Sequence, residues 1–98
     1  MEINKNKNGE SFNIELVGRL DTTTAPQLDA VVTSELDGVT DLTLDFSSLE
    51  YISSAGLRVL LAAQKKMNVQ GKMVIKNVND DIKEVFDITG FADILTVE

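Results

Sequence analysis

The sequence has 98 residues, of which 43% are hydrophobic and 26% charged, which is typical of one globular domain and excludes a disordered chain. Its formal net charge of -7, from 9 basic and 16 acidic residues, excludes a simple nucleic-acid-binding protein, because phosphate backbones require a basic surface. The chain contains neither cysteine nor histidine, which excludes disulfides, thiolate metal sites and the most common general base.

The first two predicted elements are strands joined by a turn. Residues 1–8 can form a short strand, and a turn at residues 9–10 follows. Residues 11–18 alternate between polar and apolar side chains, which predicts a half-buried strand whose apolar face carries Phe12, Ile14 and Leu16.

A helix is predicted next, after a loop that contains three threonines. The threonines offer hydroxyl caps, and Pro26 fits the first helical turn, where its missing N–H would be unpaired in any case. Gly38 with Val39 is predicted to end this helix. Apolar residues recur along it at helical spacing, at Leu28, Val31, Val32 and Leu36.

The remaining chain alternates between strands and helices. The pattern predicts a strand at 42–46, a helix from about 54 to 68 that closes near Gly71, and a strand at 72–78. A third helix follows, capped by Asn79 and ended by Gly90, with a possible short strand at 94–97. The acidic residues after Asn79 suit the first turn of a capped helix better than a metal site. The order ββαβαβα(β) predicts a single α/β domain with a mostly parallel mixed sheet of four to five strands.

The stretch "YISSAGLRVLL", residues 51–61, places two serines before a helix. The simplest interpretation is capping, in which a serine hydroxyl accepts a hydrogen bond from an unpaired N–H one turn later. A cap needs only one hydroxyl, however, and Gly56 in the first turn costs about 1 kcal/mol relative to alanine. Small residues at this helix start would let another backbone or a phosphate come close. A phosphorylated serine there would present new negative charge to a docked partner.

Three segments, taken in order, resemble the STAS domain family and in particular the bacterial anti-sigma factor antagonists. "LTLDFSSLEYISSAGLRVLL" is similar to the family's central signature, a strand ending in Asp, a Ser-x-Leu turn, and Asp-Ser-Ser/Thr-Gly-Leu opening a helix. "GRLDTTTAPQL" resembles the family's Gly-x-Leu-Asp loop, and "VFDITGFADIL" resembles its C-terminal segment. The resemblance covers essentially the whole chain and implies one STAS domain over residues 1–98.

On this resemblance, Ser54 occupies the position that a cognate serine kinase phosphorylates, with Ser53 as a rival acceptor. Ser53 stands where many members have Asp, and Ala55 stands where a second Ser or Thr is usual. The missing acid removes one like charge from beside a future phosphate. The resemblance also implies that a partner is bound by one loop and one helix start, with the contact residues Asp21, Thr22, Thr23, Thr24, Ser53, Ser54, Ala55, Gly56, Leu57 and Arg58.

The mechanism that the resemblance implies is partner switching. The unphosphorylated protein would bind an anti-sigma factor that is also a serine kinase of the histidine-kinase-like ATPase fold, so that a sigma factor is released. Phosphorylation of Ser54 would dissociate the complex, and a metal-dependent serine phosphatase would reset it. ATP and magnesium would belong to the partners, so we expect this chain to need no cofactor or metal and to be a monomer when free.

Three charged residues each allow two interpretations. Asp21 either bonds to the backbone of its own loop or contacts the partner. Asp45 is either a solvated carboxylate at a strand end or, as the resemblance favours, a residue that supports the loop carrying Ser54. Arg58 lies off the apolar positions of its helix, so we expect it to be exposed. There it is solvated, or it pairs with a phosphate on Ser54 or with a partner carboxylate.

Two other functions compete with the switch. An enzyme with Ser54 as nucleophile would need a positioned base, and the chain has no His, no Cys and no Ser-x-x-Lys arrangement around that serine. The other candidate is a non-switching STAS adaptor, as in a lipid-transport complex or a stressosome-like scaffold; the lipid-transport type generally lacks the acceptor serine that this chain retains. No apolar run approaches the roughly 20 residues of a membrane span, and the first residues lack the apolar core of a signal peptide. We therefore expect a cytoplasmic protein that binds neither membranes nor nucleic acid.

Overall fold

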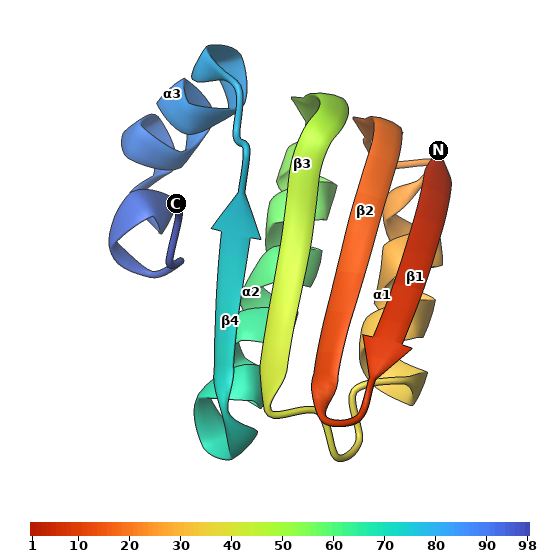
Figure 1. Ribbon diagram of the computed structural model, residues 1–98. Coiled ribbons are helices and arrows are strands. Elements are labelled where there is room, and N and C mark those ends of the chain that lie inside the picture. Colours follow the sequence, from red (N-terminus) through yellow and green to blue (C-terminus); the bar gives the residue numbers. More distant parts are fainter.

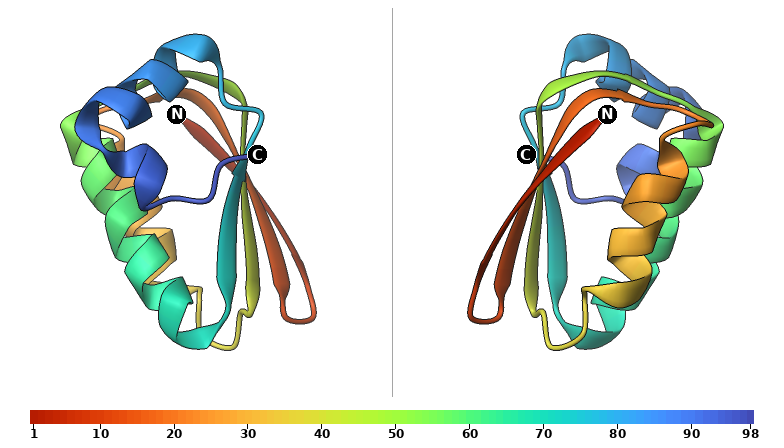
Figure 2. Two further views of the ribbon diagram at one scale, coloured as in Figure 1. Left: turned by 90° about the vertical axis from the view of Figure 1, so that its left-hand side faces the viewer. Right: turned by 90° about the vertical axis from the view of Figure 1, so that its right-hand side faces the viewer.

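All helices lie on one face of a mixed sheet in the computed structural model, which describes residues 1–98 (Figures 1 and 2). The sheet has four strands in the order β1-β2-β3-β4, namely β1 (Glu2–Asn8), β2 (Ser11–Leu20), β3 (Asp41–Ile52) and β4 (Lys72–Lys76). The first pair is antiparallel and the other two pairs are parallel. The predicted fold class and element order are therefore confirmed.

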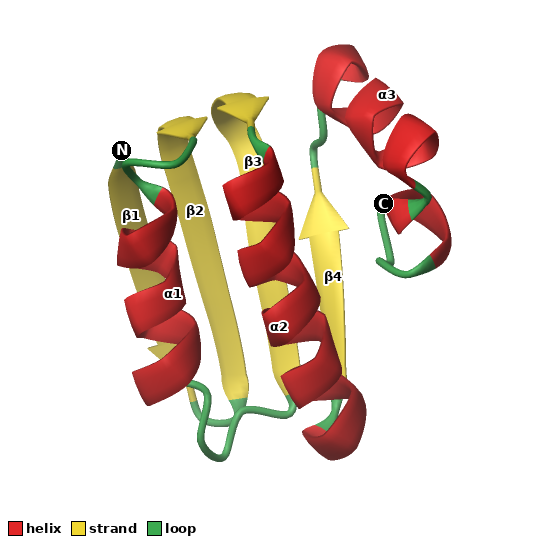
Figure 3. Cartoon of the chain, turned by 180° about the vertical axis from the view of Figure 1, so that it is seen from behind, coloured by secondary structure: helices red, strands yellow, loops and turns green.

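Two helices cover the sheet, and a third lies on the same side but beyond the β4 edge (Figure 3). They are α1 (Ala25–Ser34), α2 (Ser54–Gln70) and α3 (Asp80–Thr89), and a short 3-10 helix, η1 (Phe91–Asp93), follows. None of the helices is both long enough and apolar enough to span a membrane. The core fills the space between helices and sheet, and its largest side chains include Ile14, Leu16, Leu28, Leu42, Leu44, Phe46, Leu60, Met67 and Phe86.

The edge strand β1 is polar although it borders the core. Lys5 pairs with Ile14 in the strand register, but its ammonium group extends to Glu35, with an Nζ to Oε2 distance of 2.9 Å. Lys7 lies over the ring of Phe12, 5.2 Å from the ring centroid. The lysine stems thus cover apolar surface while their charges stay in water, and charged side chains protect an open sheet edge from pairing with other chains.

Strand β3 is longer than predicted because its apolar spacing changes along its length. Its core-facing residues alternate up to Phe46, and then Leu49 and Ile52 follow at intervals of three. The parallel pairing with β2 absorbs the extra residues as two register shifts. A bulge adds one residue to one strand of a pair, so the chain from 47 to 52 continues as strand instead of forming the predicted turn.

Helix α1 ends earlier than predicted. Its last residue is Ser34, and Gly38, with φ of 79°, instead occupies a turn in which the Val39 N–H bonds to the Leu36 carbonyl at 3.1 Å. Leu36 stays fully buried, so its place in the apolar spacing was correct but its helical conformation was not. The Gln70 side chain donates hydrogen bonds to the carbonyls of Leu36 and Val39, which holds this turn against the end of α2.

The third helix follows the sequence prediction. Asn79 caps it through a hydrogen bond from the Ile82 N–H to Oδ1 at 2.8 Å, and Gly90 ends it in the left-handed conformation with φ of 80°. The possible last strand at 94–97 is reduced to one parallel bridge between Val97 and Ile75. The side chain of Asn79 also donates from Nδ2 to the Leu49 carbonyl at 3.0 Å, which fastens α3 to the second half of β3.

Substitutions at Asn79 test this double role. Asn79→Ala removes the cap and the bond to β3, so we expect the free energy of unfolding to fall by about 1–2 kcal/mol. Asn79→Ser retains a cap acceptor and loses only the bond to Leu49, so the expected loss is about half as large. Urea denaturation of the three proteins measures both values. Equal losses for Ala and Ser would show that the cap contributes nothing.

Candidate functional site

The predicted contact residues meet where β2 and β3 end side by side. A backbone hydrogen bond joins the two ends, from the Ser53 N–H to the Leu20 carbonyl at 2.9 Å. The loop to α1 follows β2, and α2 begins directly after β3. Both helices therefore start at the same end of the sheet, where these two strands finish (Figure 3). The structure therefore brings together the loop of Asp21 and the start of α2, which lie about thirty residues apart in the sequence.

The loop of residues 21–24 is ordered by the carboxylate of Asp21. Its Oδ1 accepts hydrogen bonds from the Thr23 N–H at 3.0 Å, the Thr23 hydroxyl at 2.7 Å and the Thr24 N–H at 3.1 Å. The Thr24 hydroxyl accepts from the Asp21 N–H at 2.8 Å and donates to the Arg19 carbonyl at 2.7 Å. Of the two interpretations left open for Asp21, the bond to its own loop is thus present. Thr22 and Thr23 remain exposed at its tip.

The ionised form of Asp21 is favoured by this arrangement. The hydrogen bond from the Thr23 hydroxyl is the largest cause, and it lowers the pKa of Asp21 below the ordinary 3.8, aided by the two backbone N–H groups. Partial burial acts in the opposite direction and is outweighed. The loop conformation is therefore tied to the charge of one carboxylate.

The two serines before α2 have different environments. Ser53 is half-buried with extended backbone, and its hydroxyl accepts a hydrogen bond from the Gly56 N–H at 3.4 Å, so it is the N-cap. Ser54 is the first helical residue, is exposed, and forms no side-chain hydrogen bond within the protein. Capping therefore falls to Ser53 alone, and the hydroxyl of Ser54 is free.

Gly56 and Leu57 were expected to contact a partner, and the structure corrects this expectation. Both are buried, Leu57 with only 5% of its surface exposed. A Cβ atom on Gly56 would lie 2.7 Å from Cγ of Leu20 and 2.9 Å from Cγ1 of Ile52, both of which are themselves buried. The glycine thus lets α2 pack closely against the ends of β2 and β3, and its absent side chain is not a space for a phosphate.

Arg58 is exposed, as predicted, and forms no ion pair with any residue of the chain. The other arginine is held in place, since Arg19 lies over the ring of Tyr51 at 4.3 Å from the centroid and its Nε is 3.9 Å from Oδ2 of Asp21. Sequence reasoning did not find the Arg19–Tyr51 pair. Tyr51 is the only tyrosine and is 42% exposed, but its pairing with Arg19 depends on the bulges of β3.

Asp45 does not support the loop that carries Ser54. It lies in the first half of β3, and its Oδ1 accepts from the Ser47 N–H at 2.9 Å and from Nδ2 of Asn77 at 3.0 Å. The bond from Asn77 is the main reason that the pKa of Asp45 is lowered from 3.8. The carboxylate therefore fixes the first bulge of β3 to the chain after β4, on the sheet face that the helices leave open.

The comparison with known families decides the assignment. Residues 2–98 match the family described as the STAS domain. The chain belongs to the STAS domain family. The resemblance inferred from its motifs is thereby confirmed.

Two curated relatives cover most of this STAS domain. A candidate anti-sigma factor antagonist, BtrV of Bordetella bronchiseptica, is 40% identical over 84 residues, which are 84% of this chain and 72% of that protein. The anti-sigma-B factor antagonist of Staphylococcus aureus is 32% identical over 88 residues, which are 88% of this chain and 82% of that protein.

Solved structures share the fold. The anti-sigma factor antagonist SpoIIAA in its unphosphorylated form gives a TM-score of 0.79 at 21% identity and covers 99% of this chain and 87% of that one. The phosphorylated form of SpoIIAA from Bacillus gives 0.77 at 21% identity, with 99% and 91% covered.

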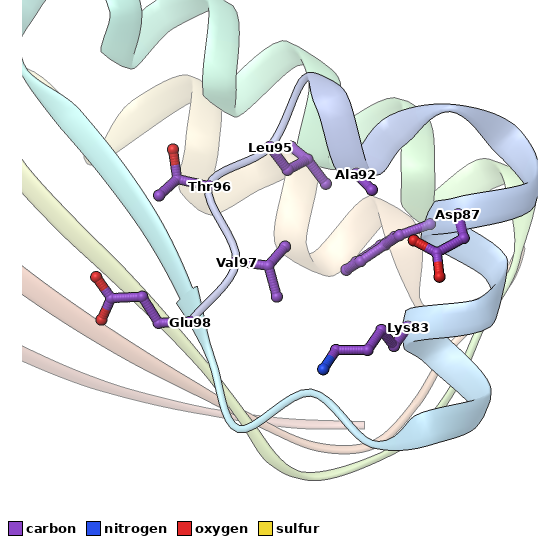
Figure 4. Close-up of a pocket in the computed structure, with 8 residues that line it drawn as sticks. Lys83, Asp87, Ala92, Leu95, Thr96, Val97 and Glu98 are labelled. Atoms are coloured by element: carbon purple, nitrogen blue, oxygen red, sulfur yellow. The ribbon is translucent and has the colours of Figure 1, made fainter.

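The pocket of this STAS domain lies away from the serines, between α3 and the C-terminal segment (Figure 4). It has a volume of about 500 Å³, and the side chains of Lys83 and Asp87 face Val97 and Glu98 across it. None of the predicted contact residues lines it. The candidate site is thus an exposed surface and not a cavity.

A substitution at Gly56 tests the packing at this site. Although alanine is the better helix former by about 1 kcal/mol, its methyl group would overlap Leu20 and Ile52, and overpacking costs about 1–3 kcal/mol. We expect Gly56→Ala to lower the free energy of unfolding, measured by urea denaturation. Val69→Ala, at a position of the same helix that is 89% exposed, is the control and should be neutral or slightly stabilising. Stabilisation by both substitutions would refute the close packing.

A titration tests the order of the loop. Since the pKa of Asp21 is lower in the folded state than in the unfolded state, its ionised form stabilises the fold at pH values above 3.8. That contribution is lost as the pH falls through the folded pKa. Thr23→Ala should raise the pKa of Asp21 toward 3.8, whereas Thr23→Ser should leave it low. Carbon-13 NMR of the carboxyl group measures this, and an unchanged pKa in Thr23→Ala would contradict the assigned hydrogen bond.

Proposed function

We propose that this STAS domain is a cytoplasmic anti-sigma factor antagonist that binds its partner when Ser54 is unphosphorylated and is released when Ser54 is phosphorylated. The observation that carries the proposal is the free, exposed hydroxyl of Ser54 at the first position of α2, beside the ordered loop of Asp21. The names of the two curated relatives support the general role, because both are designated as anti-sigma factor antagonists.

The partner binds a surface that we call the docking face, formed by Thr22, Thr23, Ser54 and Arg58. All four residues are exposed, and they come from the two chain segments that the hydrogen bond between Ser53 and Leu20 holds together. Their side chains are polar or charged, so an interface over them depends on matched hydrogen bonds and charge. Such an interface is sensitive to one added phosphate.

The kinase is the partner itself, and it belongs to the histidine-kinase-like ATPase fold. In the transfer step, Oγ of Ser54 attacks the γ-phosphorus of ATP, and the bond between that phosphorus and the bridging oxygen breaks. ADP leaves with the bond electrons, and the hydroxyl proton passes to a base of the kinase. The chain has no histidine, and the Ser54 hydroxyl has no hydrogen-bond partner of its own, so ATP, magnesium and the base are all supplied by the partner.

The phosphate ends the complex because of its charge and size. It adds about -1.5 to -2 charges at neutral pH to a protein whose net charge is already -7. In an interface fitted to a hydroxyl, the phosphate would lose most of its hydration and would be too large for the space. A metal-dependent serine phosphatase hydrolyses the phosphoserine and restores the binding form.

Ser54 is the better acceptor of the two serines. The hydroxyl of Ser53 accepts the capping bond from Gly56, and this residue is half-buried, whereas Ser54 is exposed. Ser53 also supplies a neutral cap where many family members have Asp, so no carboxylate lies beside the phosphate. Phosphorylation of Ser54 therefore leaves the helix cap intact.

Catalysis by this chain itself finds no support in the geometry of the site. A nucleophilic serine requires an adjacent base and donors for the developing oxyanion. Ser54 lies on an exposed surface with no hydrogen-bond partner for its hydroxyl, and the pocket of the domain is lined by other residues. We therefore propose that the domain acts by binding.

A binding experiment with variants tests the proposal. Wild type, Ser54→Ala and Ser54→Glu are used as baits in extract of the cells that express the chain, and the kinase retained by wild type is then purified. Without ATP, Ser54→Ala should bind this kinase as wild type does. With ATP and magnesium, wild type should lose about 100-fold in affinity while Ser54→Ala retains it, because burying the added charge in the interface costs about 3 kcal/mol.

Ser53→Ala is the matched control, since it removes the neighbouring hydroxyl but leaves the acceptor. It should still be phosphorylated and released. Release of Ser54→Ala by ATP, or protection of Ser53→Ala from release, would refute the assignment. Equal retention of all variants with and without ATP would favour the non-switching adaptor.

A further inference from the structure

We propose that Arg58 binds the phosphoryl group of phosphorylated Ser54 within the same helix. The inference rests on the proposed function in one respect only, that Ser54 is the residue that becomes phosphorylated. In this role Arg58 forms an ion pair with the phosphate on Ser54 and fixes the position of that phosphate.

The positions of the two residues on α2 allow this contact. Ser54 is the first residue of the helix and Arg58 follows four residues later, so their side chains lie on the same face one turn apart. The Cα–Cβ bonds of a helix tilt toward its N-terminus, so the long arginine side chain is directed back over the position of Ser54. Both side chains are exposed. Gly56 and Leu57 lie between them in the sequence but point to the buried face of the helix, so they do not block the contact.

No other group of the protein competes for this guanidinium. From residue 51 to residue 64, Arg58 is the only charged residue, although the chain as a whole has 16 acidic residues. The ion pairs of the structure involve Lys5, Arg19 and Lys66, and none involves Arg58. Arg19 differs in this respect, because it already lies against Tyr51 and Asp21. Arg58 is thus a free cation beside the acceptor serine.

The chemistry of the two groups is well matched. A phosphoserine offers three acceptor oxygens and close to two negative charges, and a guanidinium offers parallel N–H donors in the geometry that phosphate accepts. The order along the helix is also the favourable one, with the anion on the N-terminal side of the cation. The partial positive charge at the N-terminal end of α2 also attracts the phosphate.

This contact would change the docking face in two ways at once. In the unphosphorylated protein Arg58 is available to a partner. After phosphorylation its guanidinium is drawn onto the phosphate, so the surface gains a phosphate and loses an accessible cation. Removal of Arg58 should therefore change the second pKa of the phosphate even when no partner is present.

The experiment uses the full chain with phosphoserine incorporated at position 54 during synthesis, together with Arg58→Gln, Arg58→Lys and Lys65→Gln versions. Phosphorus-31 NMR across pH 4–8 gives the second pKa of the phosphate, whose ordinary value is about 6. In wild type, Arg58 should hold this pKa about 0.3 unit lower than in Arg58→Gln, the shift that corresponds to an ion pair on a helix surface. Arg58→Lys should give an intermediate value.

Lys65→Gln is the matched control, because it removes the same charge from an exposed position of the same helix, far from Ser54. It should leave the phosphate pKa at the wild-type value. Equal pKa values in wild type and Arg58→Gln would overturn the proposal, and so would equal shifts in Arg58→Gln and Lys65→Gln, which would reflect net charge alone. Amide spectra of the unphosphorylated variants verify that each is folded.

The outcome is independent of the kinase, since the phosphoserine is introduced chemically. If native protein carried no phosphate on Ser54, the proposed function would fail while the titration stayed interpretable. If the titration showed no effect of Arg58, this inference would fail while the switch at Ser54 stood.

Discussion

The hydrogen bond between the Ser53 N–H and the Leu20 carbonyl is the contact on which the site depends. It extends the contact between β2 and β3 to Ser53, the residue directly before α2. Gly56 completes the junction, because a side chain there would collide with Leu20 and Ile52. With α2 seated in this way, its first residue lies beside the loop ordered by Asp21. The exposed surface formed by this loop and the start of α2 thus arises from the ends of two strands.

The division of roles between the two serines follows from this junction. Ser53 is fixed by its backbone bond to Leu20 and by the capping bond from Gly56, so its hydroxyl is committed to the fold. Ser54 is held in position by the same helix, but its hydroxyl has no task in the fold. A modification at Ser54 can therefore alter binding without unfolding the helix start. The structure thus separates the capping hydroxyl of Ser53 from the free hydroxyl of Ser54, and the proposed switch requires this separation.

Much of this architecture follows from local sequence signals, and the features that the sequence did not predict share one cause. The alternation in β2 and the cap at Asn79 were recognisable because each reflects neighbours in the chain. The second half of β3, the bonds of Asp45 and the pairing of Arg19 with Tyr51 were not, since all of them depend on bulges that shift the register between strands. The positions of the serines were predictable, but their different tasks required the backbone geometry at the helix start.

The most direct test of the switch at Ser54 is mass analysis of the protein recovered from its native cells, intact and as peptides, with and without phosphatase treatment. We predict one phosphate, located on Ser54 and removed by the phosphatase. Phosphate on Ser53 alone would contradict the assignment of cap and acceptor. The absence of phosphate under all growth conditions would contradict the switch itself.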